Sequence, residues 1–192
     1  MIVEDKRRTA ILLNAYDIGR KEMIPIAENI SPRKLDYIVQ KLKEVQVASL
    51  VSDSGTPVIS DPGLAVIARC WQEGMEIDII PGPSAITSSV AASGFPGNRF
   101  IFLGFLPRRR KRRKLFRELM SWKGVIVFFE SPSRLVETLK DVLDILGDLE
   151  IFIAREMTKI HQEFFKGRVG EAIEHFNGEV MGEITVVMRK EE

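Results

Sequence analysis

Residues 50–63 read Leu-Val-Ser-Asp-Ser-Gly-Thr-Pro-Val-Ile-Ser-Asp-Pro-Gly, and this stretch decides the fold prediction. The apolar run before it, Val45 to Val51, predicts a buried strand. Glycine and proline at the density seen here force turns, so the strand must end in this stretch. An apolar, helix-like run, Leu64 to Trp71, follows at once. Open α/β sheets bind ligands in loops of this kind, which join the carboxyl end of a strand to a helix.

The side chains of this loop indicate what kind of ligand it could hold. It carries the carboxylates Asp53 and Asp61 and several hydroxyl groups, with no lysine or arginine beside them in the sequence. Such a loop offers acceptors to ligand hydroxyls or to a cation, whereas phosphate needs donors. The alternative is that both aspartates only cap turns and the next helix. Spacing alone leaves these two interpretations about equally supported.

A second strand, turn and helix follow in the same order. Residues 75–80 predict a strand, Pro81-Gly82-Pro83-Ser84 a tight turn, and Ala85 to Ser93 a small-residue helix. In a parallel sheet both loops emerge at the same edge, so residues 53–63 and 81–84 could line one crevice. Two ordinary strand–helix turns remain the simpler alternative.

The pattern changes after Gly94-Phe95-Pro96-Gly97-Asn98, where turn-forming residues cluster. We therefore expect two α/β domains, residues 1–98 with a parallel sheet and residues 99–192 with a mixed sheet. The second domain reads as strands and helices that end in three strand-like runs without long helices between them, which favours a mixed or antiparallel sheet. Its expected strands span residues 99–106, 124–129, 150–154, 161–165 and 182–189, with helices from the basic run to 121, from 131 to 147 and from 169 to 176.

Composition narrows the class of protein. The chain has 192 residues, 45% of them hydrophobic, and one cysteine, Cys70, so no internal disulfide is possible and a reducing cytoplasm is compatible. No apolar run is long enough to span a bilayer, no signal peptide is visible, and the cysteine and two separated histidines suggest no metal cluster.

Charge is distributed unevenly along the chain. Residues 108–114 read Arg-Arg-Arg-Lys-Arg-Arg-Lys and Arg117 follows, so eight of the 28 basic residues lie there and the other 20 face 27 acidic residues. A basic segment on an otherwise acidic protein predicts a local contact with a polyanion such as RNA. The alternative is a solvated start of a helix.

Six segments in this order resemble a known family. They are residues 51–63, 80–85, 91–96, 102–107, 129–134 and 154–159. Together they resemble the tetrapyrrole methylase superfamily, and within it the branch of small-subunit ribosomal RNA methyltransferases. The sequence has no G-x-G-x-x-G, Walker or G-x-S-x-G motif, which argues against an NAD-dependent enzyme, an ATP-dependent enzyme and a serine hydrolase. This agrees with the resemblance.

The resemblance implies a function and a set of site residues. It implies 2′-O-methylation of a cytidine ribose in small-subunit ribosomal RNA by S-adenosylmethionine, two α/β domains with the cofactor in the cleft between them, and commonly a homodimer. The cofactor-binding residues it implies are Asp53, Gly55, Thr56, Gly82, Pro83, Ser84, Phe129, Gly182 and Glu183, with Glu130 beside them. The predicted RNA contacts are Arg108, Arg109, Arg110, Lys111, Arg112, Arg113 and Lys114.

The reaction also requires the attacking ribose hydroxyl to lose its proton. A ribose hydroxyl is a weak acid, so a base or a nearby cation should assist the loss of its proton. The candidates by position are Glu130, Arg155, Glu156 and Lys159. A salt-bridged strand end is an equally good interpretation of Arg155-Glu156.

The sequence departs from the family at its beginning. Relatives start with a further strand, a Thr-Pro-Ile-Gly-Asn-Leu turn and a helix ahead of a Glu-Asp-Thr-Arg segment, whereas this sequence opens at Met1 almost directly on Glu4-Asp5. We therefore expect a shortened first domain and weak binding of S-adenosylmethionine. Two alternative functions stay open: methylation of a small tetrapyrrole, and an inactive RNA-binding remnant.

Overall fold

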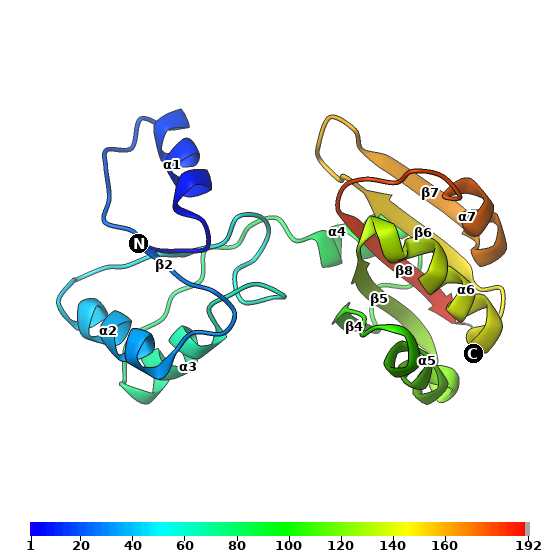
Figure 1. Cartoon of the computed structure of the whole chain (residues 1–192), viewed down its shortest axis with the longest axis horizontal. Coiled ribbons are helices and arrows are strands. Elements are labelled where there is room, and N and C mark those ends of the chain that lie inside the picture. Colours follow the sequence, from blue (N-terminus) through cyan, green and yellow to red (C-terminus); the bar gives the residue numbers. More distant parts are fainter. Residues whose placement is uncertain (191–192) are drawn as a thin grey trace. The chain divides into compact units, whose positions relative to one another are not determined.

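The computed structural model describes residues 1–190. The chain divides into two compact units, Met1–Pro83 and Ser84–Glu192, each with its own sheet (Figure 1). The sequence predicted the division after residue 98, and the helix α4 (Ala85–Ser93) is the element that the two divisions assign differently. Val90 of α4 packs with Val125, Val127 and Val187 of the second sheet, which explains why α4 goes with the second unit.

The first unit has a small parallel sheet with strand order β2-β1-β3. Its core contains Ile2, Ile26, Ile38, Val66 and Cys70, drawn from the sheet and from two helices. The strands are β1 (Ile2–Val3), β2 (Ile24–Pro25) and β3 (Leu50–Val51), and the helices are α1 (Lys6–Ala15), α2 (Pro32–Lys43) and α3 (Leu64–Gln72).

Helix boundaries in this unit follow local sequence signals. Ser31 caps α2, since its hydroxyl oxygen accepts from the backbone N–H of Lys34, and Pro32 takes the first helical position, where its missing N–H does no harm. Gly63, with φ of +131°, precedes α3; a Cβ there would lie 2.9 Å from a methyl group of Leu50. Only glycine fits this turn between the strand and the helix.

The strand predictions in this unit were less accurate. Residues 75–80 were predicted as a strand, and this is wrong: they form no ladder in the structure. The side chain of Asp78 accepts from the backbone N–H of Ile79 at 2.8 Å, a local bond that competes with strand pairing. The strand predicted over Val45–Val51 is shortened to its last two residues. The strand β2 was not foreseen, because proline argues against a strand except at the edge of a sheet. Pro25 lies in such an edge strand.

The second unit is a five-stranded mixed sheet with order β4-β5-β8-β6-β7. β4 and β5 are parallel, whereas β8 pairs antiparallel with β5 and β6, and β7 antiparallel with β6. The predicted mixed sheet is therefore confirmed. The strands are β4 (Phe100–Phe105), β5 (Gly124–Glu130), β6 (Glu150–Arg155), β7 (Glu163–Arg168) and β8 (Ile184–Lys190).

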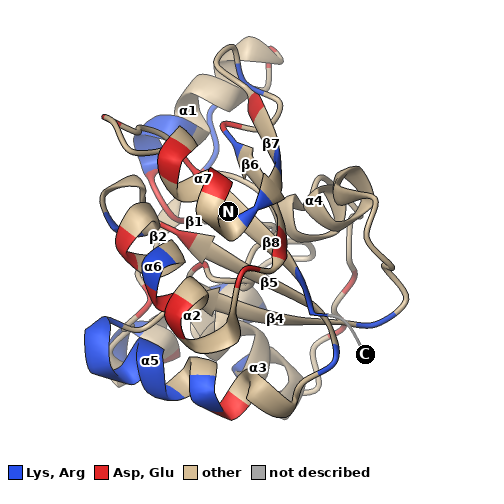
Figure 2. Cartoon of the chain, turned by 90° about the vertical axis from the view of Figure 1, so that its right-hand side faces the viewer, with Lys and Arg blue, Asp and Glu red and all other residues tan. Residues whose placement is uncertain are grey.

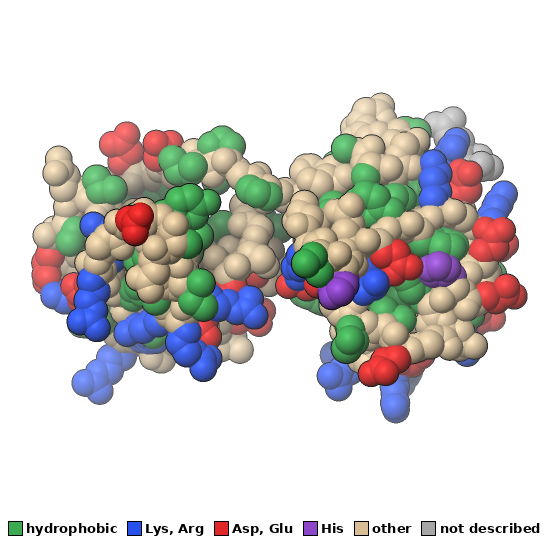
Figure 3. Space-filling view, turned by 90° about the horizontal axis from the view of Figure 1, so that it is seen from above, with side chains coloured by type: hydrophobic (Ala, Val, Ile, Leu, Met, Phe, Trp, Pro, Cys, Tyr) green, Lys and Arg blue, Asp and Glu red, His purple; other side chains and the backbone are tan. Residues whose placement is uncertain are grey.

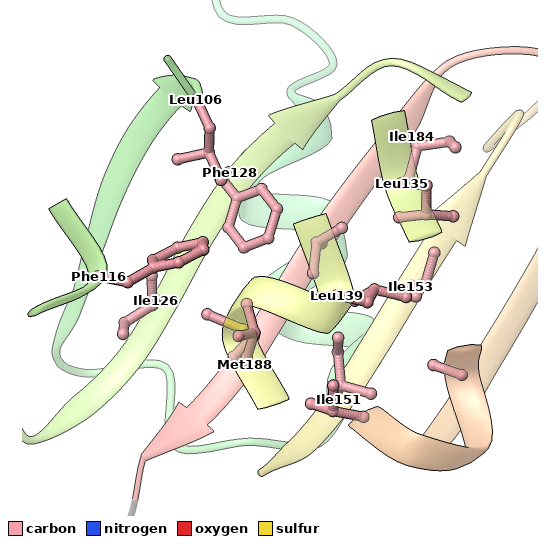
Figure 4. Packing of buried hydrophobic residues seen from close by; sticks show 14 of the residues in the cluster. Leu106, Phe116, Ile126, Phe128, Leu135, Leu139, Ile151, Ile153, Ile184 and Met188 are labelled. Atoms are coloured by element: carbon pink, nitrogen blue, oxygen red, sulfur yellow. The ribbon is translucent and has the colours of Figure 1, made fainter. Parts of the chain in front are cut away.

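Helices cover both faces of this sheet. The helices other than α4 are α5 (Arg109–Glu118), α6 (Leu135–Leu146) and α7 (Val169–His175), with short 3-10 turns η1 (Leu119–Ser121) and η2 (Pro132–Arg134). Phe116 of α5 and Leu139 of α6 pack on one face with Phe128 and Ile153 of the sheet (Figure 4). Ala172 of α7 belongs to the same cluster. The alternating inward residues of the strands thus supply two cores, one on each face.

Two features are absent from the described residues 1–190: a membrane-spanning helix and a cluster of potential metal ligands. None of the helices there has the length and apolar character needed to cross a membrane. Across the same residues, His, Cys, Asp and Glu side chains nowhere gather in a group of three that could hold a metal ion.

Candidate functional site

In the first unit, the carboxyl ends of the neighbouring parallel strands β1 and β3 bring Glu4-Asp5 next to Asp53. The Asp53 carboxylate accepts from the backbone N–H of Asp5 at 3.2 Å and lies 3.5 Å from Nε of Arg8. The backbone N–H of Asp53 donates to a carboxylate oxygen of Glu4 at 3.1 Å. A carboxylate has about four lone-pair positions, so Asp53 keeps capacity for a ligand. The sequence suggested no cation beside this loop, and the structure corrects this with Arg8 from α1.

The two glycine- and proline-containing loops of this unit touch each other. The Thr56 hydroxyl donates to the Pro83 carbonyl oxygen at 3.5 Å, which joins residues 53–56 to the turn at 82–83. Gly55 has φ of +69°, a conformation that favours glycine, and a Cβ on Gly82 would meet no atom within 4 Å. Main chain is therefore open to a ligand at both glycines.

The backbone of this loop is also strained. Val58 and Ser60 have φ of +76° and +66°. Left-handed φ is unusual for a β-branched residue such as valine, and such strain clusters at ligand-binding segments. The loop geometry is consistent with the predicted ligand loop.

In the second unit, the sheet brings predicted residues from three strands to one edge. Ile184, the first residue of β8, pairs with Glu130 at the end of β5 and with Arg155 at the end of β6. Glu183 and Gly182 precede Ile184, and Glu156 follows Arg155. Residues that are far apart in sequence thus meet at this edge, which the antiparallel pairing of β8 makes possible.

Four of the predicted residues form one compact cluster at this edge. The Lys159 ammonium lies 2.9 Å from Glu156 and 3.0 Å from Glu183. The Glu156 carboxylate also accepts from the backbone N–H of Glu183 at 2.8 Å. Gly182 is required here, because a Cβ at its φ of +96° would lie 2.3 Å from Cγ of Glu156. Glu156 itself has φ of +47°, so backbone strain again marks the site.

The cluster sets the protonation states of its members. The Lys159 ammonium and the Glu183 backbone N–H lower the pKa of Glu156 below its usual value of 4.5. Its hydrogen bond to Glu156 raises the pKa of Lys159 above its usual 10.5, and Glu183 adds to this. A general base works best with a pKa near the operating pH, so neither residue is a good base at neutral pH. Lys159, whose side chain is 43% exposed, is instead a stable surface cation.

Arg155 ties this edge to the loop before β8. Its Nε donates to Glu163 at 2.6 Å and its Nη1 donates to the Met181 carbonyl oxygen at 3.1 Å. Glu163 also pairs with His175 at 2.7 Å, and the imidazole and then the Arg155 guanidinium lower the pKa of Glu163. In the space-filling view, histidine side chains lie among charged ones on the surface of this unit (Figure 3). These contacts support the salt-bridged strand end that the sequence left open.

Glu130 sits in a different environment from the other candidates. It is 1% exposed, and it accepts from the Thr138 hydroxyl at 2.6 Å and from the Ser131 backbone N–H at 2.8 Å. Nε of Arg134 lies 3.3 Å away. A carboxylate so enclosed cannot reach a substrate hydroxyl. Glu130 instead holds Thr138, Ser131 and Arg134 in place.

Phe129 and Ser84, the remaining predicted cofactor residues, differ in their surroundings. The Phe129 ring packs 5.0 Å from Phe102 and 5.5 Å from Phe105 between ring centroids. Ser84 precedes α4, but its hydroxyl makes no capping bond; only its carbonyl accepts, from Ser88 N–H and the Thr87 hydroxyl. The Ser84 hydroxyl therefore does not cap α4.

A hollow of about 680 Å³ lies beside this edge within the second unit. Its volume falls in the range of small-molecule sites. Gly182 is the one predicted residue in its lining, which otherwise comes from the start of α6 and the loop after α7. The lining residues are Pro132, Ser133, Val136, Phe176, Asn177, Gly178, Glu179, Val180, Met181 and Gly182. A hollow of about 430 Å³ in the first unit contains none of the predicted residues.

The basic segment forms the start of α5, where Lys and Arg concentrate (Figure 2). It does not act as one uniform surface. Arg112 is 1% exposed, and the guanidinium of Arg113 pairs with Asp141 and Asp144 of α6. Arg112 is therefore wrong as a predicted RNA contact, and Arg113 is already paired. The exposed cations are Arg108, Arg109, Arg110, Lys111, Lys114 and Arg117.

Several residues of these sites were missed by the sequence reasoning. Glu4, Asp5 and Arg8 contact Asp53, and the signal was available, because they directly follow a strand parallel to the one that leads to Asp53. Acidic residues spaced for one helical face on α6, Glu137, Asp141 and Asp144, indicated partners for a basic helix. Thr138 gave no such signal.

The comparisons with known proteins agree with this architecture. The chain matches the family model described as tetrapyrrole (corrin/porphyrin) methylases over residues 4–173. The chain therefore belongs to the tetrapyrrole (corrin/porphyrin) methylase family. Within this family it is 55% identical to ribosomal RNA small subunit methyltransferase I of Thermotoga maritima, over all of this chain and 86% of that protein. A protein of the same name from Hydrogenobaculum sp. is 37% identical over 98% of this chain and 83% of that protein.

Solved structures share the fold at low sequence identity. Diphthine synthase matches with a TM-score of 0.66 and 15% identity over 99% of this chain and 79% of that chain. The uroporphyrin-III C-methyl transferase of Thermus thermophilus complexed with S-adenyl homocysteine matches with a TM-score of 0.60 and 14% identity over 97% of this chain and 84% of that chain. At these identities the match shows the fold alone.

Proposed function

We propose that this protein is an S-adenosylmethionine-dependent methyltransferase that methylates the 2′-hydroxyl of a cytidine ribose in small-subunit ribosomal RNA. The observation that supports this most strongly is the 55% identity, over the whole chain, with a protein named for methylation of small-subunit ribosomal RNA. The choice of cytidine and of the 2′-oxygen comes from the family resemblance of the sequence segments. A ribosomal substrate would place the protein in the cytoplasm, and the resemblance also leads us to expect a homodimer.

The residues present fit S-adenosylmethionine. The cofactor carries a sulfonium cation and a ribose diol but no phosphate, so it needs acceptors and close main chain. The first unit offers the Asp53 carboxylate and the turns at Gly55, Thr56, Gly82 and Pro83, which would hold the cofactor with Ser84. In the second unit, Gly182 and Glu183 directly precede Ile184, which pairs with Glu130 next to Phe129.

The cofactor supplies a methyl group that is already activated by the positive sulfur. The protein must therefore mainly align the ribose oxygen with that methyl group, and alignment alone accounts for much of such a rate enhancement. As the methyl group is transferred, the hydroxyl proton would pass to solvent water, since Glu156 and Lys159 are poor bases at neutral pH. The exposed Lys159 ammonium, held by Glu156 and Glu183, would stabilise the negative charge that develops on the oxygen. Glu156 would position this cation, and Arg155 would hold the neighbouring loop before β8 through the Met181 carbonyl oxygen.

The exposed cations of α5 would hold the RNA. Lysine and arginine neutralise phosphates without reading sequence, so they would supply affinity and not the choice of nucleotide. The side chain of Phe105, 59% exposed at the end of β4, could add stacking on a base, whereas Phe116 is fully buried and cannot. Exposed cations also argue against the alternative, a small tetrapyrrole substrate, which needs no such row of charges.

Two experiments test the proposal. Calorimetric titration with S-adenosylmethionine should show saturable binding, and the absence of binding would favour the inactive RNA-binding alternative. Transfer of labelled methyl groups should then be measured on small ribosomal subunits and, in parallel, on a uroporphyrinogen-type tetrapyrrole. Label in ribosomal RNA supports the proposal, and label only in the tetrapyrrole would reject it.

A further inference from the structure

The buried arginine of the basic segment has a defined set of partners. Arg112 lies on the side of α5 that faces α6 and is 1% exposed. Its Nε donates to Asp141 at 2.8 Å, and its Nη1 donates to the Thr138 hydroxyl at 2.9 Å. Nη2 lies 2.6 Å from Asp141 and 3.2 Å from Glu137. Six neighbouring cations, Arg108, Arg109, Arg110, Lys111, Lys114 and Arg117, are exposed, so the burial of Arg112 needs a separate explanation.

The contacts continue from Arg112 to the sheet edge of the candidate site. The Thr138 hydroxyl is fully buried, and it donates to Glu130 at 2.6 Å while it accepts from Arg112. Because a hydroxyl has one proton, the direction of this chain is fixed, from guanidinium to hydroxyl to carboxylate. Glu130 is the last residue of β5, and it pairs with Ile184, which also pairs with Arg155.

A second arginine closes the network at the start of α5. Nε of Arg134 lies 3.3 Å from Glu130, and its Nη2 donates to the carbonyl oxygens of Leu106 and Pro107 at 2.7 and 3.0 Å. Leu106 and Pro107 connect β4 to the basic segment. Glu130 is therefore linked both to the beginning of α5 and to its first turns.

We propose that Arg112, Thr138 and Glu130 are positioning residues that hold the exposed cations of α5 in a fixed place relative to the sheet edge with Arg155, Glu156 and Lys159. This inference rests on the proposed function, which assigns RNA to α5 and methyl transfer to that edge. Apolar side chains could pack α5 on α6 at less desolvation cost than a buried arginine. Directed hydrogen bonds instead fix the position of the helix, and methyl transfer is sensitive to displacements of about 1 Å.

The test compares a buried with an exposed arginine of the same helix. Arg112→Lys keeps the charge, but a single ammonium cannot span Thr138 and Asp141 as the guanidinium does. We expect kcat on small ribosomal subunits to fall at least tenfold, while the dependence of RNA affinity on salt concentration stays unchanged. Arg110→Gln, the matched control, should raise KM and lower the slope of log affinity against log salt by about 0.7–0.9, the value for one phosphate contact.

A second pair of variants tests the hydroxyl in the middle of the network. Thr138→Val keeps the shape and removes both hydrogen bonds, so it should reproduce the loss of kcat. Thr138→Ser keeps the hydroxyl and should retain most of the activity, which a purely structural role of the methyl group would not predict. Amide hydrogen exchange of residues 109–118 should be faster in Arg112→Lys and Thr138→Val than in the wild type.

Defined results would overturn the inference. Wild-type kcat in Arg112→Lys would do so, and so would a loss of salt dependence equal to that of Arg110→Gln, because Arg112 would then contact phosphate. Should Arg112→Lys fail to fold, equal kcat in Thr138→Val and Thr138→Ser would decide against it. Failure of the proposed function is a different result, namely no methyl transfer by the wild-type protein, and hydrogen exchange in α5 then decides the positioning role alone.

Discussion

Gly182→Ala is the substitution that tests the geometry of the candidate site most sharply. A Cβ at residue 182 would lie 2.3, 2.5 and 2.6 Å from three atoms of the Glu156 side chain, and φ is +96°. The left-handed conformation alone costs an alanine about 1–2 kcal/mol. At about 2–4 °C per kcal/mol for a chain of this size, we expect the melting temperature to fall by about 2–8 °C.

The functional effect should be larger than the effect on stability. Glu156 can move away from the new methyl group, but it then loses the backbone N–H of Glu183 and the Lys159 ammonium. We expect at least a tenfold loss of methyl transfer, because displacement of a positioned cation by about 1 Å is costly. Melting curves, calorimetric titration with S-adenosylmethionine and methyl-transfer rates measure the three consequences.

The same loop offers a matched control. Gly178 also lines the hollow of the second unit, but a Cβ there would meet no atom within 4 Å, so Gly178→Ala should behave as the wild type. The double variant Glu156→Ala/Gly182→Ala should be less destabilised than the sum of the two single variants, because the clash is gone. Additive effects, or a Gly182→Ala protein that is as stable and active as Gly178→Ala, would refute this account of the site.

Other predictions concern the first unit, the cation and the α5–α6 contact. Thr56→Val should weaken the binding of S-adenosylmethionine about threefold in calorimetry, since it removes one modest hydrogen bond to Pro83, and Thr56→Ser should restore it. Lys159→Met should abolish most methyl transfer while Lys159→Arg retains part of it. The Lys159–Glu156 pair stabilises the fold fully between the ordinary Glu pKa of 4.5 and the ordinary Lys pKa of 10.5. Chemical denaturation should therefore show that Lys159→Met is less stable than the wild type in this range. The difference should disappear as pH falls through the lowered pKa of Glu156 or rises through the raised pKa of Lys159. A difference that instead changes between about pH 6 and pH 9 would contradict these protonation states. Asp141→Ala leaves buried Arg112 with weaker partners and should cost about 3 kcal/mol of unfolding free energy, whereas Asp144→Ala, at an exposed position, should cost less than about 1 kcal/mol.

The fold was largely predictable because its local signals are strong. The helix Ala85–Ser93 was predicted to the residue, and the helix-like run predicted from Leu64 to Trp71 extends one residue further in the structure, to Gln72. The strand predicted over residues 75–80 failed because an apolar run does not reveal whether a neighbouring strand is available for pairing. Asp78, inside that run, was the local sign against a strand.

The candidate site was predictable only in part, because its contacts depend on pairing between distant strands. Asp53, Glu156 and Gly182 could be selected from their segments, but their partners could not. The contact of Asp53 with Glu4 and Asp5 requires the parallel pairing of two short strands. The basic segment was read as one charged surface because sequence alone does not show which cations of a helix face an acidic neighbour.

The central claim is that this protein places a methyl group on a ribose oxygen of small-subunit ribosomal RNA, and alkaline hydrolysis tests it most directly. Small ribosomal subunits that lack the modification should be incubated with the protein and labelled S-adenosylmethionine, and their RNA should then be treated with alkali. A 2′-O-methyl group blocks attack on the adjacent phosphodiester, so we expect the label in an alkali-resistant dinucleotide with cytidine on its 5′ side. Label recovered in alkali-sensitive mononucleotides would place the methyl group on a base and contradict the claim, and so would RNA that remains unlabelled.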